Sequence, residues 1–534
     1  MKTLRLAAQR FTAQGFTALA FTALALTAPG TAVAQQKVLR HVPQADLKVL
    51  DPVVNPAFIT VQHAYMVYDQ LFALDASRRP QPQMAESVTL SPDNRTYTIT
   101  LRPGLRFHDG TPVRAADAMA SIKRWTVKDP AGSQMPKLGM ELKAIDDRSF
   151  TLSLREPWGM AIDAMAKPSW ALFVMREVDA MRDVASPVTE VVGSGPFRFV
   201  RSEWVPGSRV VYERNPDYVP RAEPAEYYSG GKRVNVDRVE WVIIPDAQTA
   251  VSALIRGEVD ELEAPSIDLL PLLAKAPGVK VTIHDRVGNQ AMLRMNHLYP
   301  PFDNPKARQA LLYMVDQADY MAAAIGNPDY WRKCYAWLMC GTPETSEAGT
   351  ADFQKPNLEK ARALLKEAGY KGEKIVVLDP TSINVVPQIS QVSIAKLREI
   401  GLNLDVQTME WSVMLGRRFR TEAPDAGGWS IWHTYSPGLD LANPVTSYAM
   451  TAPCAKTGWP GWACNPALEK LRDAYGRELD PAQRKIIADQ IQREVAVFVP
   501  IVPLGQFFQP VAYRTNLVGV LEVPIPVMWN VEKK

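Results

Sequence analysis

The sequence carries little of the chemistry on which enzymes and metal proteins depend. It has six histidines, and none lies four residues from another, so the paired ligands of an H-E-x-x-H zinc site are missing. It also has no G-x-S-x-G elbow, P-loop or G-x-G-x-x-G turn. Gly193-Ser194-Gly195 comes nearest to a nucleophile element, but Pro196 follows it, which favours a turn. We therefore expect no catalytic residue, no metal ligand and no cofactor.

An excess of charge of one sign is also absent. Residues 1–34 contain Lys2, Arg5, Arg10 and no acidic residue; without them, 57 basic side chains face 57 acidic ones. Nucleic-acid binding depends on the neutralisation of phosphates, so this balance argues against a nucleic-acid partner. Beyond residue 34 the best apolar stretch, 495–511, is broken by three prolines. We expect no membrane-spanning segment in the mature chain.

The first 34 residues have the pattern of an export signal. The three basic residues precede an apolar run over 15–27, and Ala32-Val33-Ala34 supplies the small residues that a signal peptidase requires. An N-terminal membrane anchor is the alternative, but the run is short and interrupted by threonines. The sequence predicts cleavage after Ala34, giving a soluble periplasmic protein. No cysteine follows the cleavage site, so we expect no lipid anchor.

Only four cysteines are present, and they form two close pairs along the chain: Cys334 with Cys340, and Cys454 with Cys464. Export permits disulfides, and each short loop would contribute roughly 2–3 kcal/mol in the chain-entropy model. The alternative, a four-cysteine metal site, lacks the C-x-x-C spacing of zinc sites. Two local disulfides are expected, although the sequence does not fix the connectivity.

Strands and helices alternate along a chain of 534 residues, which is long enough for two or three lobes. Thr96–Arg102 alternates apolar residues with threonines, as a half-buried strand does. Capping and periodicity predict helices over about 115–125, after Asn304-Pro305, over 358–368, over 388–400 and after Asp480-Pro481. The strand–helix–strand unit 374–407 favours an α/β fold with a parallel sheet.

Several segments, taken in order, match a known pattern. They are Tyr97–Gly104, Arg106–Pro112, Ala116-Asp117, Ile122–Arg124, Val192–Phe197, Arg214–Tyr218, Gly257–Asp260, Pro301–Arg308, Asp316, Arg484 and Val499-Pro500. Together they resemble the periplasmic peptide-binding proteins, the family 5 extracellular solute-binding proteins of ABC importers for dipeptides, oligopeptides and nickel. The resemblance runs through nearly the whole mature chain.

This resemblance implies a two-lobed periplasmic-binding-protein-like α/β fold with an inserted subdomain. The first lobe would comprise residues 35–76, 190–285 and 500–534. The inserted subdomain, 77–189, would pack on the first lobe, and the second lobe would comprise 286–499. A ligand would lie between the lobes, which close by hinge motion.

The resemblance also implies ligand contacts at two charged residues. In peptide-binding members an aspartate four residues before a proline holds the ligand's α-amino group, and Asp440 stands at that distance from Pro444. The alternative is that Asp440 caps the turn before Asn443-Pro444. Trp411 and Arg418 resemble a tryptophan and an arginine that approach the ligand, with Arg418 facing a carboxylate. A solvated arginine in the basic cluster 417–420 is the alternative.

Aromatic residues gather near the second cysteine pair and would form a permissive pocket wall. The candidates are Trp429, Trp432, His433, Tyr435, Trp459 and Trp462. Packing in a core is the alternative for about half of them. The Cys454–Cys464 segment beside them resembles a disulfide loop of dipeptide-binding members.

The sequence thus predicts a monomeric binding protein that captures a small ligand, expected to be a peptide, and delivers it to permease subunits with their ATPase. Relatives on this scaffold also carry nickel chelates, glutathione, opines or sugar-like solutes, so these ligands remain alternatives. A secreted peptide hydrolase and a periplasmic sensor or chaperone partner are the rival classes. The hydrolase would need a nucleophile–base pair or a metal, which the sequence does not offer.

Overall fold

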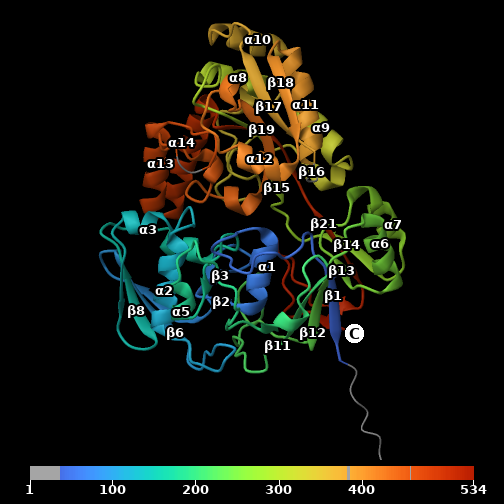
Figure 1. Cartoon of the computed structure of the whole chain (residues 1–534). Coiled ribbons are helices and arrows are strands. Elements are labelled where there is room, and N and C mark those ends of the chain that lie inside the picture. Colours follow the sequence, from blue (N-terminus) through green and yellow to red (C-terminus); the bar gives the residue numbers. More distant parts are fainter. Residues whose placement is uncertain (1–35, 382–384, 457–458) are drawn as a thin grey trace, which may run out of the picture. The chain divides into compact units, whose positions relative to one another are not determined.

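The computed structural model describes residues 36–381, 385–456 and 459–534. The predicted export signal and its cleavage point therefore lie outside the described residues. Residues 37–534 form one compact unit. Two large sheets and one smaller sheet organise this unit (Figure 1).

The first lobe is built on a seven-stranded sheet. Its strands, in spatial order, are β10 (Phe197–Phe199), β11 (Arg209–Arg214), β12 (Arg238–Val242), β1 (Val38–Val42), β13 (Glu261–Leu262), β21 (Pro510–Arg514) and β14 (Val279–Ile283). β1 runs parallel to β12 and β13, and the other pairings are antiparallel. Its helices are α1 (Phe58–Val67), α6 (Ala247–Arg256) and α7 (Leu270–Lys275).

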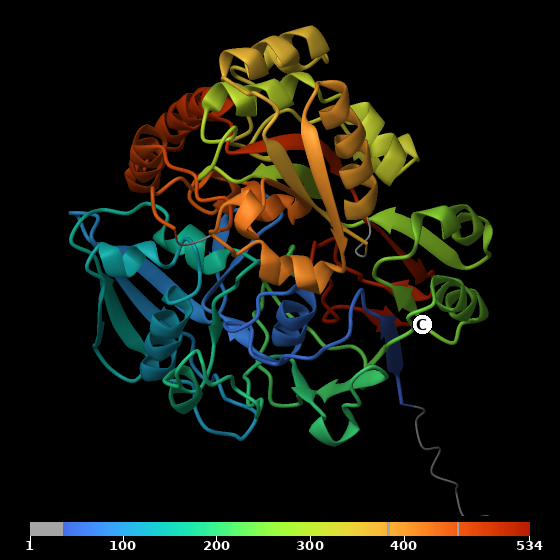
Figure 2. The ribbon, with the colours of Figure 1, turned by 45° about the horizontal axis from the view of Figure 1, so that its top comes forward.

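The second lobe is built on a six-stranded sheet. Its strands, in order, are β16 (Trp331–Arg332), β20 (Ile501–Phe507), β15 (Asn289–Met295), β19 (Ile431–Pro437), β17 (Lys374–Pro380) and β18 (Asn403–Met409). Its helices are α8 (Pro305–Tyr313), α9 (Gln317–Ala324), α10 (Leu358–Glu367), α11 (Val386–Glu399), α12 (Trp411–Arg417), α13 (Pro466–Arg477) and α14 (Pro481–Phe498). α11 packs on β17, β18 and β19 (Figure 2).

The inserted subdomain is built on a four-stranded antiparallel sheet. Its strands are β5 (Ala85–Leu90), β6 (Thr96–Leu101), β8 (Ser149–Ser153) and β7 (Glu141–Ala144), with helices α2 (Ala115–Thr126), α3 (Gln134–Lys137), α4 (Ala161–Ala166) and α5 (Glu177–Ala180). Three separate two-stranded sheets lie outside these larger ones: β2 (Asp69–Gln70) with β9 (Phe173–Val174), β3 (Phe72–Leu74) with β4 (Pro80–Pro82), and β22 (Leu517–Val518) with β23 (Glu532–Lys533).

Local sequence signals account for most of these elements. In β6 the apolar side chains of Tyr97, Ile99 and Leu101 are buried, while the threonines between them are half-buried, as the alternation predicts. Asn304 begins α8, because its side chain accepts a hydrogen bond from the Lys306 amide at 2.9 Å. Asp480 begins α14 in the same way. The predicted parallel unit is confirmed, since β17 pairs with β18 in parallel over seven residues.

One expected boundary is wrong. The expected first lobe includes β20, within 500–534, yet β20 pairs with β15 and β16 of the second sheet. The chain reaches the first sheet only at β21, so the crossing falls at Phe508-Gln509. Every residue of β20 is buried, because this strand lies inside the second sheet and not in a connection between lobes.

The inserted subdomain packs on both lobes. Its side chains Ala120, Phe173 and Met175 belong to the first lobe's core, as expected. A larger apolar cluster joins its core, including Trp158, to residues of the second lobe such as Tyr475. Packing on the first lobe alone would have left this second face exposed, so the expectation was incomplete.

The Gly193-Ser194-Gly195 segment marks the passage from the subdomain into the first lobe. A Cβ at Gly193 would lie 1.6 Å from the Val67 carbonyl oxygen, so only glycine allows the two backbones to cross here. The His108 imidazole brackets the crossing: Nδ1 accepts from the Gly193 amide at 3.3 Å and Nε2 contacts the Gly195 carbonyl at 3.2 Å. The segment is therefore a point at which two stretches of backbone cross in contact.

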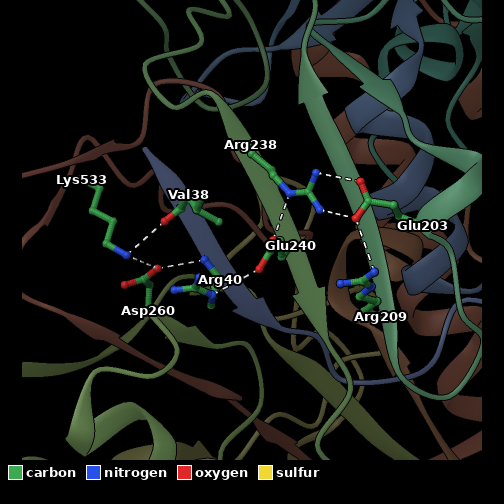
Figure 3. Close-up of polar contacts among 8 residues, drawn as sticks. All are labelled: Val38, Arg40, Glu203, Arg209, Arg238, Glu240, Asp260 and Lys533. Atoms are coloured by element: carbon green, nitrogen blue, oxygen red, sulfur yellow. Dashed lines mark hydrogen bonds and ion pairs between the residues drawn. The ribbon is translucent and has the colours of Figure 1, made fainter. Parts of the chain in front are cut away.

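A ladder of ion pairs crosses the first sheet at β1, β12 and β11 (Figure 3). Arg238 bonds Glu240 at 2.9 Å and reaches Glu203, which also pairs with Arg209 at 3.4 Å. Lys533 donates to Asp260 at 2.8 Å and to the Val38 carbonyl at 3.0 Å. These contacts tie the last strand of the chain to the first described one.

Candidate ligand site at the carboxyl edge of the second sheet

Three neighbouring strands of the second lobe end at the same edge. β17 runs parallel to both β18 and β19, so their carboxyl ends, Pro380, Met409 and Pro437, point the same way. Trp411 stands two residues after β18, and Asp440 follows β19 within the 3-10 turn Gly438–Leu441. Open α/β sheets bind ligands beyond the carboxyl ends of their strands, so this edge is the candidate site.

Asp440 meets the inserted subdomain at this edge. Its carboxylate is buried, and Oδ1 accepts a hydrogen bond from the hydroxyl of Ser169, which follows α4. Lys167 approaches the same carboxylate and forms an ion pair with the buried Asp129. Neither Ser169, Lys167 nor Asp129 was among the sequence candidates. Their distance along the chain left no signal that could have found them.

The charges in this cluster do not balance. Burial raises the pKa of Asp440 above its ordinary value; Lys167 and Ser169 oppose the rise and Asp129 adds to it. With every group ionised, one ammonium faces two carboxylates, a net charge of minus one. An unpaired buried charge is costly, so the cluster favours either a proton on Asp440 or one additional cationic group.

The Asp440 side chain reaches away from its own turn. Its described side-chain hydrogen bond comes from Ser169, 271 positions earlier in the chain. The side chain of Asn443 caps the turn that follows, since it accepts hydrogen bonds from the amides of Val445 and Thr446, both at 3.0 Å. These contacts favour the amine-anchor hypothesis for Asp440 over the turn-cap alternative.

A cluster of aromatic rings adjoins Asp440. The ring centroids of Trp432 and Trp459 lie 5.3 Å apart, and those of Tyr448 and Trp459 lie 5.2 Å apart, both edge to face. Trp432 and Trp459 were predicted for the pocket wall, and the structure brings them together. Tyr448 was missed; its hydroxyl donates to Ser436 at 2.7 Å.

Trp429 and Trp462 are core residues, and they belong to the same apolar cluster as the buried Trp432. The ring centroids of Trp429 and Trp462 are 5.8 Å apart, and Met414 packs in the same cluster. The Trp429 indole donates to the Arg418 carbonyl at 2.9 Å. Trp411 packs half-buried against this cluster. Trp429 also packs edge to face with Trp432, with their ring centroids 6.4 Å apart.

Arg418 is not a solvated arginine. Its guanidinium lies 4.9 Å from the centre of the Trp432 ring and is half-buried. Burial lowers the pKa of Arg418 to about 10. Its buried Nε has no hydrogen-bond partner among the described residues. The neighbouring Arg417 has a structural role, because it donates hydrogen bonds to the Gln407 side chain and to the Gly428 carbonyl.

Tyr448 is near both charged residues. The pKa of its phenol is raised, first by burial and then by Asp440, while Arg418 opposes the rise. The carboxylate and the guanidinium are therefore both near enough to the Tyr448 hydroxyl to act on it. The site thus has an acidic end, an aromatic wall and a basic end.

Two candidates lie on the other face of β19. Successive residues of a strand point to opposite faces, so His433 and Tyr435 point away from Trp432. The His433 imidazole is fully buried, and burial lowers its pKa to about 3. Tyr435 packs edge to face on Phe507 of β20 at 5.3 Å. The structure therefore separates these two residues from the aromatic wall.

Both predicted disulfides are present, Cys334–Cys340 and Cys454–Cys464. The second closes the segment that carries Trp459 and Trp462, so it fixes the base of the wall. Within the described residues no group of three or more His, Cys, Asp or Glu side chains is arranged to hold a metal ion. The same residues include no helix long and apolar enough to cross a membrane.

The inserted subdomain also meets the second lobe at α13. A cavity of about 420 Å³ lies between them, lined on its two sides by residues such as Trp158 and Arg477. Arg477 pairs with Glu156 across it at 2.5 Å. Two large sheets in one chain, with a candidate ligand site at the carboxyl edge of strands in one of them, are typical of two-lobed solute-binding proteins.

Comparison with known proteins agrees with this class. Residues 79–459 match the family model of the bacterial extracellular solute-binding proteins, family 5. The chain belongs to this family, which consists of binding proteins and not of enzymes. A probable peptide ABC transporter periplasmic-binding protein of Sinorhizobium fredii is 42% identical over 94% of both chains.

Two further relatives have narrower descriptions. The glutathione-binding protein of Escherichia coli K12 is 25% identical and covers 90% of this chain and 91% of its own. The Helicobacter pylori periplasmic binding protein DppA, solved with the peptide STSA, has a TM-score of 0.77 at 21% identity. It covers 93% of this chain and 98% of its own, which confirms the two-lobed fold.

Proposed function

We propose that the protein captures a short zwitterionic peptide in the periplasm and delivers it to the permease of an ABC importer. The observation that carries the proposal is the buried Asp440 cluster, in which one ammonium faces two carboxylates. A peptide's α-ammonium supplies the missing positive charge and three hydrogen-bond donors. Charge-assisted hydrogen bonds of this kind contribute roughly 1.5–3 kcal/mol.

Arg418 receives the opposite end of the ligand. A half-buried guanidinium above an aromatic ring, with its Nε unbonded to the described residues, is suited to a carboxylate. Because Asp440 and Arg418 both act on Tyr448, the two ligand charges would be held a short distance apart. This favours short peptides over long ones.

The wall between the two charged ends is permissive. Trp459 and Tyr448 offer apolar faces with polar tips, so they accept side chains of differing size. Selection would rest on the ligand's ends and not on its side chains. The same end groups occur in glutathione, and glutathione is accordingly an outcome of the test below.

Binding would be coupled to closure of the lobes. The Ser169–Asp440 hydrogen bond joins the inserted subdomain to the second lobe, so it breaks when these bodies separate. A ligand ammonium at Asp440 replaces this contact and stabilises the closed form by differential binding. The closed form of a monomer is the shape that a permease would recognise, and the predicted signal 1–34 would place it in the periplasm.

The test begins with native mass spectrometry of the exported protein, which weighs any co-purifying ligand. Thermal shifts are then measured with one dipeptide in four forms: free, N-acetylated, C-amidated and blocked at both ends. We expect the free form to stabilise the protein most and the doubly blocked form least. Equal stabilisation by all four forms, or stabilisation by a nickel chelate or a sugar alone, would overturn the proposal. Cleavage of the peptide would favour the hydrolase.

No contact among the described residues of the site favours a second function.

Closure of the lobes is measured directly by small-angle scattering with and without the free dipeptide. We expect a smaller radius of gyration with the ligand, and identical curves would contradict hinge closure.

A further inference from the structure

Arg294 is a fully buried arginine directly beneath the aromatic wall. It lies on β15, where its Cα is paired with that of Trp432 on β19. Its Nε donates to the Pro460 carbonyl at 2.9 Å and its Nη1 donates to the Pro500 carbonyl at 2.8 Å. One guanidinium thus holds the backbone beside Trp459 and the backbone that enters β20.

No carboxylate forms an ion pair with Arg294 among the described residues. Burial, with a further contribution from Arg308, lowers the pKa of Arg294 to about 9. An unpaired buried cation is expensive, and an apolar side chain of similar length would fill the space at lower cost. This cost indicates that the guanidinium makes an interaction that an apolar side chain could not make.

The contact that explains the cost is with Trp459. The guanidinium carbon lies 4.6 Å from the centre of the Trp459 ring, within the range of a cation–π interaction. Trp432 and Tyr448 each pack edge to face with the Trp459 ring. Trp459 is therefore held by Arg294 together with the two aromatic residues that adjoin Arg418 and Asp440.

The backbone after Trp459 is shaped to pass over this guanidinium. Gly461 has a φ of +119°, and a Cβ there would lie 2.2 Å from the Arg294 Nε. The Gly461 carbonyl accepts a hydrogen bond from the His297 amide at 2.9 Å. Both the conformation and the absence of a side chain at Gly461 are what the close approach of Arg294 requires.

We propose that Arg294 is a positioning residue for ligand binding, which fixes the Trp459 ring and thereby sets the side-chain preference of the pocket. The inference rests on the proposed function, because it assumes that the wall faces the ligand. Arg294 itself lies behind the wall. Its effect on the ligand passes through Trp459.

The chain offers a matched control in Arg308 on α8. Arg308 is also buried, donates to the Phe498 and Phe302 carbonyls, and lies 4.7 Å from the centre of the Phe498 ring. Its described contacts do not include the aromatic wall. Arg294→Lys and Arg308→Lys therefore remove comparable hydrogen bonds, but only the first disturbs Trp459.

The experiment measures the affinities of the exported full-length protein for the dipeptides Ala-Phe and Ala-Ala, together with its near-ultraviolet circular dichroism without ligand. A cation–π contact contributes about 0.5–2 kcal/mol, so we expect Arg294→Lys to change the ratio of the two affinities by roughly 2- to 30-fold. It should also weaken the tryptophan dichroism. Arg308→Lys should lower the melting temperature while leaving the ratio and the dichroism unchanged.

If Arg294→Lys fails to fold, Trp459→Leu tests the inference, because loss of the ring that Arg294 holds should change the same affinity ratio. If Arg294→Lys folds, it should no longer change the ratio in a Trp459→Leu background, because leucine offers no ring to the cation. Equal changes in the ratio for Arg294→Lys and Arg308→Lys, or a change that persists without Trp459, would overturn the inference. If the wild type binds neither dipeptide, the proposed function fails, and the dichroism alone decides whether Arg294 positions Trp459.

Discussion

Ser169 donates its hydroxyl hydrogen bond to Asp440 although the two residues are 271 positions apart in the chain. The contact occupies the carboxylate that we assign to the ligand's ammonium. The Ser169 hydroxyl is neutral. It satisfies one oxygen of the Asp440 carboxylate but does not neutralise the carboxylate's negative charge. A ligand ammonium would therefore gain the full charge interaction when it displaces or joins the hydroxyl.

The first prediction concerns Asp440→Asn, which preserves the shape and removes the charge. Affinity for a free-amine dipeptide should fall roughly 10- to 150-fold, the equivalent of about 1.5–3 kcal/mol. Affinity for the N-acetylated dipeptide should change little. Isothermal titration calorimetry at neutral pH measures both.

Asp379→Asn is the control for this variant. Asp379 is another buried carboxylate near the carboxyl end of β17; it is held by Ser390, Gln391 and Thr408, and no ion pair joins it to a cation among the described residues. Its substitution should lower stability without affecting the discrimination between free and acetylated peptides. Undiminished discrimination in Asp440→Asn would remove Asp440 from the amine site.

The second prediction is a proton released on binding. Burial raises the pKa of Asp440 in the ligand-free protein, and a ligand ammonium lowers it by favouring the ionised carboxylate. Affinity should therefore rise with pH through the acidic range and level off above the raised pKa. Calorimetry in buffers of different ionisation enthalpy counts the released proton.

The stability of the ligand-free protein should respond to Asp440 in the opposite sense. Because the folded protein binds this proton more tightly than the unfolded chain, the free energy of unfolding falls as pH rises through the raised pKa. Asp440→Asn should remove both effects. A proton count of zero in the wild type across the acidic range would contradict the assignment.

Local patterns predicted the elements, and distant contacts decided the site. The strand at 96–101, the helix that Asn304 begins and the parallel unit around α11 follow from alternation, capping and periodicity within short windows. The position of β20 does not, because a fully buried apolar strand carries the same pattern in either sheet. Only its pairing with β15 distinguishes the two.

The site shows the same division. Trp432, Trp459 and Arg418 were found because aromatic and basic residues cluster in the sequence. Lys167 and Ser169 come from the inserted subdomain, and only tertiary packing brings them to Asp440. Residue spacing also grouped His433 with Trp432, although the alternation of β19 sends them to opposite faces. The register of β19, and not the local composition, therefore decides that Trp432 faces the aromatic wall and that His433 does not.

The third prediction concerns His41, which is buried between two carboxylates of the first lobe. Its Nδ1 lies 3.3 Å from Glu261 and its Nε2 lies 3.6 Å from Glu263. Burial disfavours the charged imidazole, but the bonds to Glu261 and Glu263 outweigh it and raise the pKa of His41 to about 9. A shift of this size from 6.5 corresponds to about 3 kcal/mol.

The sign follows from proton linkage. The stabilisation is fully present below pH 6.5, the ordinary value, and is lost as the pH rises through about 9. Chemical denaturation at pH 6 and pH 9.5 should show the loss in the wild type and a flatter response in His41→Gln. His63→Gln is the control, because burial lowers the pKa of His63 to about 3 and it stays neutral throughout this window. Parallel pH profiles for wild type and His41→Gln would refute the prediction.

The fourth prediction separates the two disulfides by function. Cys454–Cys464 closes the segment that carries Trp459, whereas Cys334–Cys340 lies beside Gln290 and Gln506, towards the opposite end of β15 from Arg294. Each short loop should contribute roughly 2–3 kcal/mol to stability. Replacing either pair by alanine should therefore lower the melting temperature.

Ligand affinity should distinguish the two double variants. Loss of Cys454–Cys464 frees the base of the wall and lets Trp459 sample other positions, so part of the ligand's binding free energy is spent on ordering the segment again. Loss of Cys334–Cys340 leaves Trp459, Arg294 and Arg418 in place, and affinity for the free dipeptide should stay near that of the wild type. Calorimetry on both variants, below their melting temperatures, makes the comparison. Equal losses of affinity would mean that the second disulfide acts only through global stability, and that the Arg294 contacts alone hold the wall.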